Sequence, residues 1–189
     1  LLLLVGFATF LQVVYAQKKK PGELKAPEPG YVYPPSVKAG TSTNIQLGGF
    51  DWTPDLQFFV FDPRIKLQTV GEPGPILVPP PPYWFGSKST IAPLPLPREQ
   101  KASLTVPADV PPGPVRWAVA NASGVGLKTG LFWVGSEPEV IEDLKSGPQK
   151  LPALPVAVCG RLSRIEEVDR YTFTAAKDGP VTCEVFARR

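Results

Sequence analysis

The sequence predicts an all-β protein in which one β-sandwich is followed by a second, incomplete one. Apolar residues recur at every second position in short runs separated by Gly- and Pro-containing turns, as in strands with one buried face. The 189 residues include 25 Pro and 17 Gly, a composition that disfavours long helices. We therefore expect short strands packed in antiparallel sheets.

The first sandwich is predicted over residues 31–136. Its alternating runs cover residues 41–50, 64–70, 101–106, 114–121 and 130–135. The run at 55–63 differs because it is apolar on both faces. Its apolar residues are Leu56, Phe58 and Val60 on one face and Phe59 and Phe61 on the other. This pattern predicts a central strand that is covered on both sides.

A Pro-rich insertion interrupts the first sandwich at residues 71–98, where nine prolines include Pro79 to Pro82. Consecutive prolines adopt polyproline II and cannot join a central strand. The insertion also contains Tyr83, Trp84 and Phe85, which are the binding candidates of the sequence. They either pack on the sandwich itself, which is the commoner outcome, or recognise extracellular carbohydrate or a proline-rich protein segment.

Residues 1–16 form a nearly continuous apolar run that ends in Val14-Tyr15-Ala16. The small residues at its end predict a signal peptide cleaved between Ala16 and Gln17. It lacks an initiator Met and a basic start, so we expect a truncated signal peptide. An uncleaved anchor is the alternative, but the run is shorter than the ~20 residues that span a bilayer. We expect a secreted, periplasmic or cell-surface protein with no stable membrane span after cleavage.

The remaining organisation consists of two linkers and a second set of strands. Residues 17–30 and 137–152 carry charge and Pro without periodicity, so both are predicted linkers. Alternation returns at 153–189, where we expect about three strands. Three strands bury too little apolar surface for a domain, so the second sandwich is expected to be incomplete and truncated.

Two cysteines in an exported chain suggest a disulfide. Cys183 shares a face with the valines of its run, whereas Cys159 falls opposite Val156 and Val158. A bulge near Gly160 would overturn this parity. Without such a bulge, strand parity favours two buried free thiols.

No catalytic residue, cofactor or metal site is predicted. The chain has no His, no Gly-x-Ser-x-Gly, no phosphate-binding glycine loop and no Cys-x-x-Cys. A net charge of +3 does not indicate the clustered basic face that nucleic acid requires. Glu166, Glu167 and Asp169 offer carboxylates of the kind calcium prefers, but they are not in an EF-hand-type loop, so we favour solvated charges.

Two stretches resemble known domains. The segments YVYPPSVKAGTSTNIQLGGFDW and LTVPADVPPGPVRWAVANASG, followed by GLFWVG, resemble the start and end of an IPT/TIG-type immunoglobulin-like domain over most of residues 31–136. The segment LPVAVCGRLSRIEEVDRYTFTAAKDGPVTCEVFARR resembles the first half of a bacterial pre-peptidase C-terminal domain. The implied fold is an immunoglobulin-like β-sandwich followed by an incomplete jelly-roll-like β-sandwich.

The predicted order of signal peptide, immunoglobulin-like domain and pre-peptidase-type domain resembles the N-terminal part of large secreted bacterial proteins. Those proteins have no assigned function, and we expect this chain to be a non-catalytic segment that acts in adhesion or scaffolding. Its partner is left open, with extracellular carbohydrate or protein as the two candidates. The alternative is an accessory region of a secreted peptidase or other hydrolase whose catalytic domain lies outside this sequence.

Overall fold

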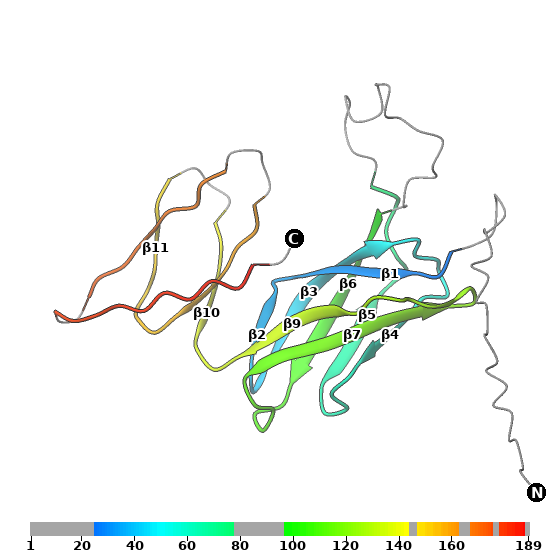
Figure 1. Cartoon of the computed structure of the whole chain (residues 1–189), viewed down its shortest axis with the longest axis horizontal. Coiled ribbons are helices and arrows are strands. Elements are labelled where there is room, and N and C mark those ends of the chain that lie inside the picture. The colour runs from blue at the N-terminus through cyan, green and yellow to red at the C-terminus, as the bar shows by residue number, and fades with distance from the viewer. Residues whose placement is uncertain (1–24, 78–96, 144–146, 163–166, 176–177, 188–189) are drawn as a thin grey trace, which may run out of the picture.

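The computed structural model describes residues 25–77, 97–143, 147–162, 167–175 and 178–187. Within these ranges the chain forms thirteen strands and no helix, which confirms the all-β prediction. Two sheets pack face to face around the main core, and two small strand pairs lie beside them (Figure 1). No helix in the described ranges has the length and apolar composition needed to cross a membrane.

The two large sheets are mostly antiparallel. The four-stranded sheet has the order β1 (Glu28–Tyr33), β3 (Thr41–Phe50), β6 (Pro97–Val106) and β5 (Lys66–Val70). The five-stranded sheet has the order β2 (Ser36–Lys38), β9 (Gly130–Gly135), β7 (Gly113–Asn121) and β4 (Gln57–Val60), and β8 (Gly124–Val125) pairs with β7. Only β2 and β9 run parallel among these pairs.

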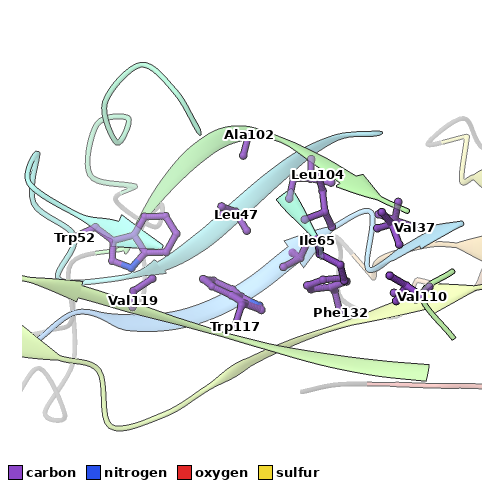
Figure 2. Packing of buried hydrophobic residues seen from close by; sticks show 14 residues of the cluster. Val37, Leu47, Trp52, Ile65, Ala102, Leu104, Val110, Trp117, Val119 and Phe132 are labelled. Carbon is purple, nitrogen blue, oxygen red and sulfur yellow. The ribbon is translucent and has the colours of Figure 1, made fainter. Parts of the chain in front are cut away.

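The core lies between the two sheets and follows the predicted alternation. Figure 2 shows residues of β3 and β6 facing residues of β7 and β9 across the interior. The inward residues of these four strands are buried: Ile45, Leu47, Ala102, Leu104, Val106, Trp117, Val119, Phe132 and Val134. Burying one large apolar side chain contributes about 1.5–3 kcal/mol. The burial of these residues therefore supplies most of the stabilisation between the two sheets.

Three aromatic side chains extend the core toward one end. The rings of Trp52 and Phe58 meet edge to face at 5.4 Å, and Phe58 lies 6.3 Å from Trp117 in a stacked arrangement. The indole of Trp52 donates a hydrogen bond to the carbonyl of Glu28 at 3.1 Å. Gly49 leaves room for that indole, because a Cβ there would lie 2.4 Å from a ring carbon. The Gly-Gly at the end of β3 is therefore required by packing.

The prediction of a central strand at 55–63 is wrong. The strand β4 lies at the edge of the five-stranded sheet. Phe58 and Val60 pack against the core, but Phe59 and Phe61 are 46% and 63% exposed. The run is apolar on both faces because β4 has an apolar outer face that is left uncovered. No second layer lies over β4 in the part of the chain that the structure describes.

The boundaries of the first sandwich differ from the prediction at one end of each of two segments. Residues 28–30, assigned to the linker 17–30, belong to β1. A bulge between Pro29 and Tyr31 interrupts the hydrogen-bond ladder next to Pro29, which has no N–H to donate. Residues 97–98, assigned to the insertion 71–98, begin β6. The backbone of Gly74 and of Leu77 also hydrogen-bonds to the start of β6.

The predicted linker 137–152 is wrong in part, because it supplies two short strands. β10 (Glu139–Ile141) pairs in parallel with β12 (Ala157–Cys159), and β11 (Gln149–Lys150) pairs in parallel with β13 (Tyr171–Thr172). We name residues 139–187 the C-terminal unit. Its last described segment, 178–187, forms no strand, contrary to prediction, and Val181 and Val185 are 55% and 80% exposed.

Candidate interaction surface

The residues singled out by the sequence as sites lie outside the described ranges. This applies to the binding candidates Tyr83, Trp84 and Phe85 and to the cleavage positions Ala16 and Gln17. Their roles stay predictions. The described residues point instead to a different surface.

The outer face of the five-stranded sheet carries exposed aromatic and apolar side chains, with Gln57 and Arg116 among them. Phe59 lies opposite Ala118 and Val125 lies opposite Ala120, so one side of the sheet carries these side chains in adjacent strands. The backbone N–H of Phe61 donates a hydrogen bond to the backbone carbonyl of Arg116, and Arg116 lies opposite Leu131 of β9. The exposed apolar members of this surface, which we name the aromatic face, are Phe59, Phe61, Val125 and Leu131.

The outer face of the four-stranded sheet is more polar, although Tyr31, Phe50 and Val70 are also exposed on it. Ser42 is 2.9 Å from the hydroxyl of Thr105 and 3.3 Å from that of Ser103. The hydroxyl of Tyr31 and the amide of Gln46 both donate to the carboxylate of Glu99. Burial, and then the hydrogen bond to Glu99, raise the pKa of Tyr31. Hydrogen-bonded polar side chains thus occupy much of the first outer face, and the aromatic face of the five-stranded sheet is the candidate interaction surface.

The C-terminal unit already covers one end of the five-stranded sheet. The ring of Phe186 stacks on the ring of Trp133, with centroids 4.4 Å apart and an interplanar angle of 27°. Trp133 belongs to β9 and points outward beside Leu131 in the alternation of that strand. In Figure 1 the last described segment, in red, runs back toward the sandwich. This sheet therefore takes an aromatic side chain from another segment of the same chain.

Two further contacts fix the C-terminal unit to the sandwich. The hydroxyl of Ser36 in β2 donates to the carboxylate of Glu139 in β10. The guanidinium of Arg161 lies over the ring of Tyr33, 4.9 Å from its centroid, at a distance typical of a cation–π contact. Polar, cationic and aromatic contacts together hold the two parts in place.

Of the three acidic residues considered as calcium ligands, Glu167 and Asp169 lie within the described ranges, and Glu166 lies outside them. Glu142, which is 9% exposed, has Asp169 and Glu167 as acidic neighbours. Burial raises the pKa of Glu142. A backbone hydrogen bond from Arg161 opposes this effect, and the nearby carboxyl groups of Asp169 and Glu167 raise the pKa further. Among the described side chains, no three acidic or thiol groups come together as metal ligands.

Both cysteines are free thiols, but they differ in exposure. Cys159 is buried, as predicted, whereas Cys183 is exposed, so the prediction of two buried thiols is wrong for Cys183. The reason is that 178–187 joins no sheet and therefore has no buried face. Burial, with a smaller effect of Glu139, raises the pKa of Cys159 to about 11, which keeps this thiol protonated and unreactive at neutral pH.

The fold and this surface define a β-sandwich protein with one exposed aromatic face and an attached C-terminal unit. No protein-family model matches the chain, and no curated protein matches it significantly. The functional interpretation therefore rests on the residues themselves. The signal for Phe59 and Phe61 was present in the sequence as a run that is apolar on both faces, although that run also fits a covered central strand.

Proposed function

We propose that this chain is a non-catalytic β-sandwich segment of a secreted, periplasmic or cell-surface protein and that it acts in adhesion or scaffolding. The observation that carries the proposal is the exposure of two phenylalanine side chains, Phe59 and Phe61, on the aromatic face. A rigid sheet that leaves Phe59 and Phe61 in water has apolar area available to a partner. Aromatic residues are enriched at the cores of protein interfaces, so the partner is an extracellular protein or carbohydrate surface.

We infer that residues 28–135 form an immunoglobulin-like module. In that fold the strands are named A to G in chain order, with A, B, E and D in one sheet and C, F and G in the other. The order β1, β3, β6, β5 corresponds to the first sheet, and the order β9, β7, β4 corresponds to the second. The parallel pairing of β2 with β9 supports this correspondence, because β2 then continues the first strand across to the second sheet.

We infer further that residues 139–187 are the first part of a jelly-roll-like, pre-peptidase-type module. The strand that ends at Cys159 and the strand that begins at Tyr171 support this inference, because both fall where the resemblance expects strands. The described residues of this unit form only short pairs, and Val181 and Val185 are exposed. Such exposure suits a unit that packs against further structure.

The adhesion proposal is tested by paired surface variants. Beads coated with the chain are assayed for attachment to immobilised extracellular glycans and surface proteins. Replacing Phe59 and Phe61 with Thr removes aromatic area and retains a β-favouring residue. Replacing Val70 and Ile76 with Thr is the matched control, since these are exposed apolar residues outside the aromatic face. Attachment should fall with the first pair alone; equal attachment by all three proteins, or none by any, would contradict the proposal.

The alternative proposal is an accessory region of a secreted peptidase or other hydrolase whose catalytic domain lies outside this sequence. The exposed Val181 and Val185 favour it, because a neighbouring domain would cover them. The coding sequence separates the two proposals. A His-containing catalytic constellation on the same polypeptide supports the accessory role, and its absence there supports the scaffold.

A further inference from the structure

The free edge of β4 carries none of the features that usually protect a sheet edge. Such an edge presents unpaired backbone N–H and C=O groups, and proteins protect it with charge, Pro, bulges or a covering segment. β1 has Pro29 and a bulge beside it, and β5 carries the exposed Lys66. β2 is three residues long, and its Ser36 donates a hydrogen bond to Glu139 of β10. β4 contains neither charge nor Pro and pairs with β7 in an unbroken register.

The direction of the backbone in β4 shows which groups lie at the free edge. The N–H of Phe61 donates to the carbonyl of Arg116 in β7, so Phe61 directs its N–H toward β7. Successive residues of an antiparallel pair alternate in this direction. Phe59 therefore also directs its backbone groups toward β7, whereas Phe58 and Val60 direct theirs away from it. No strand among the described residues pairs with that side of β4.

There is room for another strand beside this edge. The neighbouring edge in the other sheet is β5, and a hollow of about 350 Å³ lies between the two strands. It is lined by Phe58 and Val60 from β4 and by Leu67 from β5. These three side chains pack against the core but are only partly buried. In the described part of the chain, β5 therefore leaves the edge of β4 open.

The unprotected edge suits a second copy of the same strand. We propose that two copies of this chain pair antiparallel through β4, around a two-fold axis at Phe59. In this register Phe58 of one copy forms a hydrogen-bonded pair with Val60 of the second copy, and the two Phe59 residues lie directly opposite each other. Gln57 then lies opposite Phe61 of the second copy, so no like charges face each other, and the opposed aromatic rings stabilise the pair.

The two-fold symmetry explains why the same strand is the occupant. In an isologous interface each edge supplies what the other lacks, so both copies satisfy their free backbone groups at once. The paired edges extend the five-stranded sheet across both copies and leave its outer face open, so the aromatic face of one copy continues into that of the other. The pairing goes beyond the adhesion role and does not depend on it.

Sedimentation equilibrium measures the association. One short strand per copy buries less than the roughly 1,200–2,000 Å² of a stable complex, so the weight-average mass should rise toward that of a dimer only between about 10 µM and about 1 mM. All proteins carry Cys183→Ser, because Cys183 is exposed and would form disulfides of its own. Phe59→Lys places like charges directly opposite each other and should keep the chain monomeric over this range.

Val125→Lys is the matched control. Val125 is exposed on the aromatic face, but it lies in β8. Ala120 of β7 pairs with Gln57 of β4 and with Val125, so β4 and β8 lie on opposite sides of β7. This variant carries the same added charge and should associate as the parent chain does. Equal loss of association in Phe59→Lys and Val125→Lys would overturn the proposal, because the contact would then involve the outer face.

Disulfide trapping checks the register, and it decides the matter if Phe59→Lys fails to fold. Directly opposed residues of a non-hydrogen-bonded pair are close enough for a disulfide, so Phe59→Cys should form a covalent dimer at least about fivefold faster than Val125→Cys under mild oxidation. Val125 is the more exposed of the two side chains, so random collision would favour the control. Equal trapping at both positions, or a chain that stays monomeric up to about 1 mM, would overturn the pairing of two copies.

Discussion

The ring of Phe186 stacks on Trp133 at 4.4 Å, so the last described segment of the chain is held on the five-stranded sheet by an aromatic pair. Such pairs contribute about 0.5–1.5 kcal/mol beyond the area that they bury. This contact between two uncharged rings does not depend on an ion pair. It should therefore persist at high salt, where exposed ion pairs are screened.

Replacing Phe186 with Ala should release this segment. The sandwich should keep its stability, because Phe186 is 68% exposed and lies outside the core cluster. Amide hydrogen exchange over 178–187 should accelerate, while exchange in β3 and β6 should stay unchanged. Val185→Ala is the control, since its side chain is 80% exposed. Equal exchange in both variants would show that the ring contact does not hold the segment.

Replacing Gly130 with Ala should destabilise the sandwich. A Cβ at this position would lie 2.1 Å from the indole nitrogen of Trp117, which is fully buried. Overpacking of this kind costs about 1–3 kcal/mol, because neither the indole nor β9 can move freely. Urea denaturation followed by Trp fluorescence measures the loss. Gly179→Ala is the control, since a Cβ there would meet nothing within 4 Å.

Replacing Gln100 with Leu should also destabilise the sandwich, because it removes hydrogen bonds. The side chain is 2% exposed, and its amide donates to the carbonyls of Val70 and Gly71 at 2.8 and 3.0 Å. Leu fills a similar volume but cannot donate these hydrogen bonds, each of which contributes about 0.5–1.5 kcal/mol. Thermal melting measures the change. An unaltered melting temperature would mean that the turn after β5 does not depend on this side chain.

The inward faces of the long strands could be predicted because each is a strict alternation. Ile45 and Leu104 are examples, since a period of two places them on one face whatever the neighbouring strand is. The position of β4 could not be predicted in this way. Phe59 is apolar and points to solvent, and an exposed aromatic face has the same sequence pattern as a covered one.

The C-terminal unit was harder to predict for two physical reasons. Its strands are two or three residues long, too short for periodicity to appear, and β10 and β11 lie among charged residues and Pro. β10 and β11 pair in parallel with later strands, and that pairing has no local signature in the sequence. The candidate surface and this pairing therefore both required the structure.

The most direct measurement is hydroxyl-radical footprinting of the Phe residues, because the central claim is that one outer face of the sandwich is aromatic and uncovered. Phe59 and Phe61 should be oxidised readily, whereas Phe132, which is 3% exposed, and Phe58, which packs on the core, should be protected. Protection of Phe59 and Phe61 equal to that of Phe132 would contradict the claim, because the face would then be buried.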